Sequence, residues 1–141
     1  IVPYSDICNI SVYSVENGDT VFIEKKSFLV KELPMPFANI LGKTEGSINK
    51  GVIKVIDKIG LGVRHELKFP PYKVCSFNLI IISDNKVSNH FINKDGGNIN
   101  KEMKTAINLA KKGDFLYFSS ILAQYPNGKL KLLAPISLMI K

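Results

Sequence analysis

Arginine, histidine and cysteine are all scarce in this chain of 141 residues, and each shortage argues against a class of function. Arg64 is the only arginine among nineteen basic residues. Proteins that read bases or clamp phosphates rely on the two-pronged hydrogen bonding of arginine. The eighteen lysines are scattered along the chain, a pattern typical of solvated lysines that keep strands soluble and unpaired. We therefore expect no nucleic-acid partner, despite the net charge of +7.

The two cysteines, Cys8 and Cys75, form no CxxC motif and lie too far apart in sequence for a compact metal site. Two interpretations stay open. In an oxidising compartment the cysteines could pair and close a long loop. Alternatively, Cys75 is a small core residue, because it alternates in register with Phe77 and Leu79. We favour the second interpretation.

The two histidines, His65 and His90, do not build a reactive centre. No GxSxG or similar motif supplies a nucleophile with its base, and two histidines with two distant cysteines do not have zinc-ligand spacing. The glycines at 42, 46 and 51 do not follow a strand as a phosphate-binding loop requires. We predict that the protein is not an enzyme and has no catalytic, metal or cofactor site.

The length and the 45% hydrophobic fraction fit one folded domain with a real core. The longest apolar run near the end, residues 132–140, is broken by Pro135 and Ser137. It falls short of the roughly 20 residues that span a bilayer. Because the chain begins at Ile1 without a methionine, we expect a mature or excised fragment of a longer protein, whose upstream part is a possible place for an export signal or anchor.

Most of the chain alternates between apolar and polar residues with a period of two, which indicates strands. The alternation predicts strands over residues 10–15, 20–24, 27–33, 73–82, 86–92, 115–122 and 129–140. Turns are expected at Asn17-Gly18, at Asp84-Asn85 and over residues 125–128. Pro135 indicates a bulge or an edge within the last strand.

One segment has helical spacing instead. Apolar residues recur at Ile99, Met103, Ala106, Ile107 and Ala110. Asn98 or Asn100 is a candidate N-cap, Glu102 lies in the first turn, and Gly113 suits the left-handed C-cap position. Residues 47–57 are ambiguous between a helical turn capped by Ser47 and a strand. We predict an all-β, immunoglobulin-like β-sandwich with one short α-helix at about residues 99–112, which covers a sheet.

Several segments, taken in order, resemble motifs of the C-terminal domain of the GldM and PorM family. The first is Phe28-Leu-Val-Lys-Glu-Leu-Pro-Met-Pro-Phe-Ala38, similar to "F-x-V-K-x-(I/L)-P-x-P-x-A". The others lie at residues 46–50, 72–77, 110–114, 117–121 with 125–128, and 133–136. Pro70-Pro71, Ala110 and Asn127 depart from the family pattern. We interpret the prolines at 34 and 36 as ending a strand and turning the chain into a loop over residues 39–51.

The resemblance implies a GldM C-terminal-like domain over residues 27–141. Residues 1–26 are then divergent N-terminal strands or the tail of a preceding domain. It also implies a noncatalytic structural or interaction domain in the periplasm of a Bacteroidetes cell, anchored to the membrane through a segment outside this chain. In that family the domain belongs to a dimeric shaft that links an inner-membrane motor to the outer-membrane parts of the type IX secretion and gliding machinery.

The implied partners are proteins of the cell envelope, and a homodimer stays open. An alternative is the same fold used as an extracytoplasmic sensor or binding module of another membrane-anchored protein, such as a regulatory peptidase. The interaction residues are not identified by the sequence, because exposed lysines, Tyr4 and Tyr13 are equally consistent with plain surface.

Overall fold

The computed structural model describes residues 7–30, 34–63 and 72–141. Arg64, His65, Pro70 and Pro71 lie outside the described residues, as does Tyr4. The chain divides into two compact units, residues 1–33 and residues 34–141. Each unit is described below by itself.

The first unit is a β-hairpin. Strand β1 (Ile7–Glu16) pairs antiparallel with strand β2 (Asp19–Leu29). The predicted turn is confirmed, because Asn17 and Gly18 have φ values of 52° and 88°, as a type I′ turn requires. The separate strand predicted at residues 27–33 is wrong where it is described: Ser27–Leu29 continue β2 and pair with Ile7–Asn9. No described residue of the hairpin is buried.

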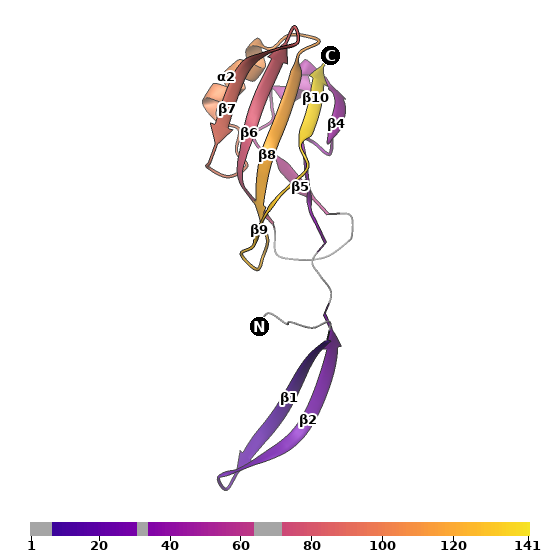
Figure 1. Ribbon diagram of the computed structural model, residues 1–141, viewed down its shortest axis with the longest axis vertical. Coiled ribbons are helices and arrows are strands. Elements are labelled where there is room, and N and C mark those ends of the chain that lie inside the picture. The colour runs from indigo at the N-terminus through magenta and orange to yellow at the C-terminus, as the bar shows by residue number, and fades with distance from the viewer. Residues whose placement is uncertain (1–6, 31–33, 64–71) are drawn as a thin grey trace. The chain divides into compact units, whose positions relative to one another are not determined.

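The second unit is built on one sheet in the order β4-β10-β8-β6-β7 (Figure 1). The strands are β4 (Glu45–Ile48), β6 (Lys73–Ser83), β7 (Lys86–Asn93), β8 (Phe115–Gln124) and β10 (Ile136–Ile140). A short strand, β9 (Leu130–Leu132), pairs with the end of β8. The β4–β10 pair is parallel and the other pairs are antiparallel.

The strand predictions for this sheet hold in most details. The hydrophobic strand β6 is flanked on both sides, and its turn into β7 has Asp84 and Asn85 at φ values of 51° and 60°. The Tyr125–Gly128 turn is closed by a 2.9 Å hydrogen bond from the Gly128 amide to the Tyr125 carbonyl. Residues 133–135 separate β9 from β10, as Pro135 indicated.

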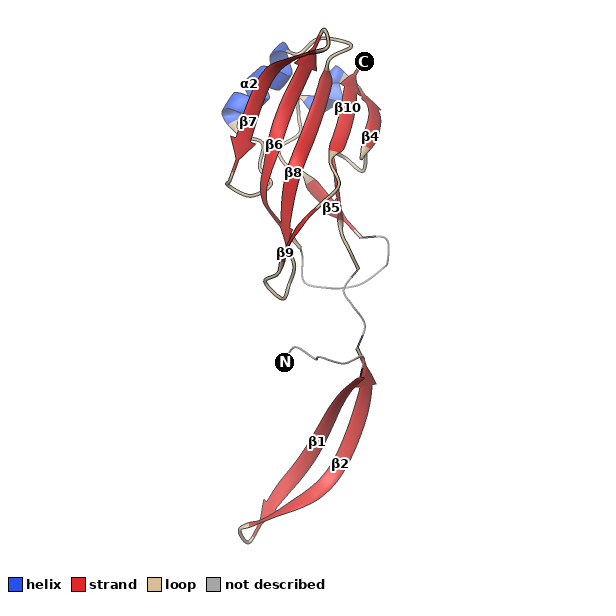
Figure 2. Ribbon diagram, in the orientation of Figure 1, coloured by secondary structure: helices blue, strands red, loops and turns tan. Residues whose placement is uncertain are grey.

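Helices and a small ribbon cover one face of this sheet (Figure 2). The ribbon consists of β3 (Phe37–Asn39) and β5 (Gly60–Gly62), paired antiparallel. The helices are α1 (Lys50–Ile53) and α2 (Lys101–Leu109), so there are two short helices where one was predicted. The cap of α1 is Asn49 rather than Ser47, because the Asn49 side chain accepts a 2.8 Å hydrogen bond from the Gly51 amide.

Helix α2 begins as predicted but ends earlier. Asn100 caps it by accepting a 2.9 Å hydrogen bond from the Met103 amide. At Ala110 the backbone leaves the helical region with ψ 145°, so the helix ends at Leu109 rather than near residue 112. Gly113 has a φ of 93° but lies in the following turn, and is not the C-cap. Its amide donates to the Ile140 carbonyl at 2.8 Å.

The segment with two prolines has a different role from the predicted one. Strand β2 ends at Leu29, and Pro34 and Pro36 precede strand β3. The following residues are also not a plain loop. Ile40 and Lys43 exchange two backbone hydrogen bonds of 2.9 Å around Leu41-Gly42, and β4 and the start of α1 follow. The prolines therefore introduce a strand instead of ending one.

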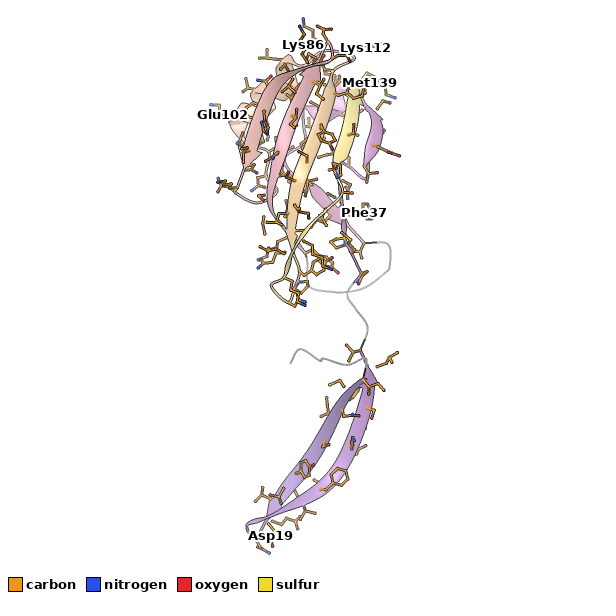
Figure 3. The ribbon with its side chains drawn as sticks, viewed as in Figure 1. Asp19, Phe37, Lys86, Glu102, Lys112 and Met139 are labelled. Atoms are coloured by element: carbon orange, nitrogen blue, oxygen red, sulfur yellow. The ribbon has the colours of Figure 1, made fainter. Side chains whose placement is uncertain are left out.

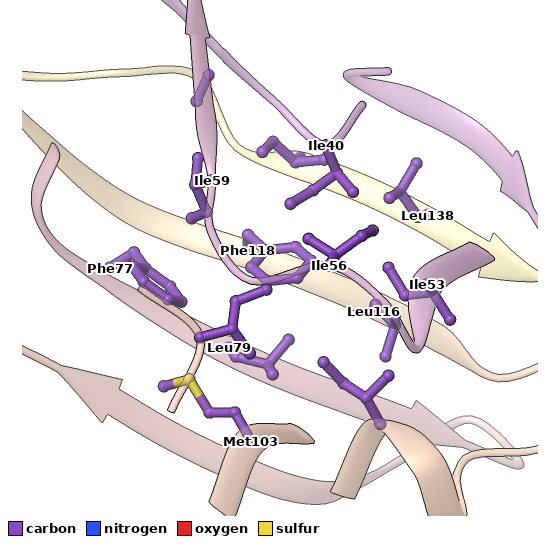
Figure 4. Close-up of a cluster of buried hydrophobic side chains, with 14 of the residues drawn as sticks. Ile40, Ile53, Ile56, Ile59, Phe77, Leu79, Met103, Leu116, Phe118 and Leu138 are labelled. Atoms are coloured by element: carbon purple, nitrogen blue, oxygen red, sulfur yellow. The ribbon is translucent and has the colours of Figure 1, made fainter. Parts of the chain in front are cut away.

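The core lies between the sheet and the layer of helices and ribbon (Figure 4). Phe77, Leu79, Leu116 and Phe118 from the sheet are fully buried, as is Met103 from α2. Burial of each such side chain stabilises the fold by about 1.5–3 kcal/mol. The chain is thus mainly β and sandwich-like, as predicted.

Cys75 does not belong to this core. It is half-buried and lies within the register shift between Val74 and Ser76 in the pairing of β6 with β8, so the simple alternation with Phe77 fails there. The interpretation of Cys75 as a core residue is therefore wrong. Both cysteines are free thiols.

Candidate interaction surface

We call the outer face the part of the opposite sheet face that is formed by alternate residues of β6, β7, β8 and β10. In β6, Phe77, Leu79 and Ile81 point into the core, so Asn78, Ile80 and Ile82 point outward. Residues opposite each other in neighbouring strands share a face. The outer face therefore comprises Val87, Ile82, Phe115 and Met139 in one row, His90, Ile80, Tyr117 and Ser137 in the next, and Ile92, Asn78 and Ser119 in the third.

Large apolar side chains of this face are open to solvent. Val87 and Ile92 are each 64% exposed, and Phe115 and Met139 are also exposed. Ile80, Ile82 and Tyr117 are half-buried between them. Within residues 34–141 the described helices and ribbon pack on the other side of the sheet (Figure 2). Exposed apolar side chains that lie side by side in this way make the outer face a candidate interaction surface.

None of the eleven outer-face residues is charged, with histidine counted as neutral. This is unexpected in a unit whose residues 34–141 contain sixteen basic and seven acidic side chains, a net charge of +9. Charged residues appear in register at the margins, where Glu45 of β4 lies opposite Ser137 and Lys86 begins β7 (Figure 3). The arrangement of an apolar centre within a polar margin is that of a protein–protein interface.

Polar groups are interspersed among the apolar ones. Asn78, Ser119, Ser137 and His90 place amide, hydroxyl and imidazole groups between the apolar side chains. Such groups fix the orientation of a protein partner through a few hydrogen bonds, and none forms a nucleophile–base pair in the described structure. The chemistry available to the outer face is therefore recognition.

A groove of about 510 Å³ lies elsewhere on the unit. It is lined by Lys58, Tyr72, Lys73 and Asn98, together with apolar residues and glycines. The Tyr72 hydroxyl donates a 2.8 Å hydrogen bond to the Pro34 carbonyl, and the ring packs edge-on against Tyr125. Burial, and secondarily Tyr125, raises the pKa of Tyr72. These contacts hold the start of the unit in place and offer no reacting group.

The sequence-derived candidates for chemistry form no reactive centre among the described residues, although His90 belongs to the outer face. His90 is exposed in β7, and His65 is not among the described residues. In the described part of the chain, no three side chains of His, Cys, Asp or Glu gather as metal ligands would. Likewise, no described helix has the length and apolar character needed to cross a bilayer.

The outer face was not identified by the sequence reasoning. Its signal is the presence of apolar residues on both faces of residues 73–82 and 115–122, which is typical of a strand covered on two sides. A local pattern does not tell which of the two faces the rest of the chain covers. Only the positions of α1, α2 and the ribbon decide that.

A comparison with protein families finds a match over residues 34–141 to a model described as the GldM C-terminal domain. The match covers the whole second unit, including the sheet that carries the outer face. No curated protein matches the chain.

Proposed function

Because the chain belongs to the GldM C-terminal domain family, a component of the gliding and type IX secretion machinery, we propose that it is a noncatalytic periplasmic domain that binds other proteins of that machinery. The resemblance noted in the sequence is thereby confirmed. The proposed work of the domain is to present its outer face to a protein partner of the cell envelope.

One observation carries the proposal: the outer face is apolar, exposed and uncharged in a unit of net charge +9. Lysine side chains are almost always exposed and are usual on a solvated protein surface. The absence of lysine from all eleven positions leaves a surface suited to burial against another protein.

The proposal extends to the organisation of the longer protein. The resemblance in the sequence implied a domain over residues 27–141, whereas the family match and the second unit begin at residue 34. We propose that residues 34–141 form the family domain and that the residues before them are divergent strands or the tail of a preceding domain. The longer protein would be anchored in the membrane through a segment outside this chain, in a Bacteroidetes cell. A homodimer of the longer protein is also part of the proposal.

A binding assay tests the function. Purified chain is immobilised, and the envelope proteins of its own gliding and secretion machinery are passed over it one at a time. We expect saturable binding to at least one of them. Absence of binding to every one of these proteins, even at high concentration, would reject the proposed role.

The noncatalytic part of the proposal needs a separate assay. Generic ester and peptide substrates are incubated with the chain and with a double variant, His65→Ala with His90→Ala. Equal background turnover in both samples is expected. Turnover that disappears in the double variant would show an enzyme instead.

A further inference from the structure

We propose that the partner of the outer face is an acidic protein, bound by an apolar centre on this face and attracted by the net positive charge of residues 34–141. The inference rests on the proposed function as an interaction domain and adds the chemistry of the partner. It follows from the separation of two properties within residues 34–141: the apolar residues face outward on one sheet face, and the charge lies elsewhere.

The charge selects the sign of the partner. Sixteen basic and seven acidic side chains give residues 34–141 a net charge of +9, and none of these charges lies among the eleven residues of the outer face. Glu45 and Lys73 lie on the same side of the sheet, beyond those eleven residues. A field of one sign accelerates the approach of an oppositely charged protein and repels a like-charged one. The uncharged centre then allows close contact without the burial of an unpaired lysine, which would oppose binding.

A second copy of this domain fits the outer face poorly. Face-to-face packing of two copies would bring two units of net charge +9 together, and the eleven uncharged residues would offer no compensating acid. Two domains of like net charge repel each other as they approach, and salt screens this repulsion. An acidic protein removes this repulsion.

A membrane surface also fits poorly. The apolar side chains lie on the pleated face of a sheet, between Asn78, Ser119 and Ser137, and not on a protruding loop or one side of a helix. Insertion into hydrocarbon would leave those amide and hydroxyl groups without partners, which is unfavourable for each group. Groups on a protein partner can satisfy them.

The size of the face sets the expected strength. Four strands and three rows of outward residues span about 15 Å in each direction. This area suits the buried centre of a standard interface, with the surrounding margin supplying the remainder. We therefore expect a complex whose rate of formation depends on salt, and whose lifetime depends on the apolar centre.

The first test is photo-crosslinking in cells that assemble the machinery, with the full-length protein. A photoreactive amino acid is placed at Val87 or Ile92 on the outer face. In control strains it replaces Leu109 of α2, which is 75% exposed, or Val55, which is 74% exposed. Adducts are identified by mass spectrometry. We expect adducts to a protein of acidic isoelectric point from the outer-face positions and not from the controls.

The second test measures binding of the purified chain to the purified partner that the crosslinking identifies. The double variant Val87→Ser with Ile92→Ser removes apolar area from the outer face without changing the charge. Leu109→Ser is the matched control, because it removes a similarly exposed side chain from α2. We expect the double variant to weaken binding by about tenfold or more and the control to change it by less than about twofold. The association rate should fall as salt rises from 50 to 300 mM.

Every other outcome contradicts the inference, the proposed function or both. Outer-face adducts to a second copy, to another part of the same chain, to lipid or to a basic protein overturn the inference. Adducts to machinery proteins from Leu109 or Val55 alone overturn it, and they also exclude the outer face as the binding surface. They leave intact the proposal that the domain binds proteins of the machinery. An acidic partner from outside the machinery would support the inference and reject the proposed function. If neither set of positions gives an adduct, both are rejected.

Discussion

The two units of the chain are built from the same kind of strand, yet they differ in what those strands cover. The hairpin of β1 and β2 has no buried residue and a net charge of −2 over residues 1–33, from three lysines and five acids. The second unit has a continuous core and a net charge of +9 over residues 34–141. In the hairpin, the alternation of residues and the turn residues are sufficient to form a strand pair. A buried core forms only in the second unit, where helices and a ribbon pack on the sheet.

The comparison also separates local from global stability. The hairpin has a well-formed type I′ turn and an edge-on contact between Tyr13 and Phe22, with ring centroids 5.6 Å apart. A two-stranded hairpin with only such contacts is marginally stable in water. In the second unit, Phe77 and Phe118 make a similar ring contact at 6.0 Å, but inside the core. The following predictions test this difference, from the largest effect to the smallest.

The largest effect should come from Phe118, which is completely buried. Phe118→Ala removes a core side chain and leaves a cavity, and we expect it to lower the free energy of unfolding by about 3–5 kcal/mol. The matched variant Phe22→Ala, at a hairpin residue that is 55% exposed, should change it by less than about 1 kcal/mol. Urea denaturation followed by circular dichroism measures both. Equal losses would contradict the division into a core and an uncovered hairpin.

An intermediate effect is expected at Gly62, where strand β5 lies under the ring of Phe37. A Cβ atom at this position would overlap the ring. Gly62→Ala should therefore destabilise the second unit by about 1–3 kcal/mol, because the ring must move away from the ribbon. The same substitution in a Phe37→Ala background should be nearly neutral. A full loss in that background, measured by thermal unfolding, would show that the ring is not the cause.

Loss of the helix cap should have a smaller effect on the same unit. Asn100→Ala removes the acceptor for the Met103 amide and should lower stability by about 1 kcal/mol. Asn100→Ser keeps a side-chain oxygen at the cap and should retain most of the stability. Chemical denaturation of the two variants decides whether the amide needs this acceptor. Identical curves for both would show that Asn100 acts in some other way.

The smallest effect on global unfolding should come from Gly18 in the hairpin turn. Gly18 has a φ of 88° with open space around it, so Gly18→Ala strains only the local backbone, by about 1 kcal/mol. We expect faster hydrogen exchange in β1 and β2. The unfolding of the second unit should change by less than about 0.5 kcal/mol, as for distant independent sites. A larger shift would show that the two units unfold together.

The sequence predicted the features that depend on neighbouring residues. The turns at Asn17-Gly18 and Asp84-Asn85 follow from residues that tolerate positive φ, and both are confirmed. The buried stripe of α2 follows from its helical spacing, since Met103, Ala106 and Ile107 are all buried. These features need no knowledge of the rest of the fold.

Features that depend on distant segments were missed. Cys75 lost its expected place in the core because register shifts in the pairing with β8 interrupt the alternation. The three-residue strands β3 and β5 are too short to give a periodic signal. The outer face was missed for a related reason. Ile80 and Ile82 are as apolar as Leu79 and Ile81, and only the packing of α1, α2 and the ribbon decides which pair is covered.

The parallel pairing of β4 with β10 has a consequence for the order of events during synthesis. Glu45 lies opposite Ser137, about 90 residues later, and the Lys141 amide donates to the Ile48 carbonyl at 3.0 Å. At about 5–20 residues per second, a ribosome needs roughly 5–20 s to deliver the neighbour of β4. During that interval β4 has no neighbouring strand to pair with, because β10 has not yet been synthesised. A chaperone that bound residues 45–48 until Ile140 emerged would protect the unpaired edge of β4 during this interval.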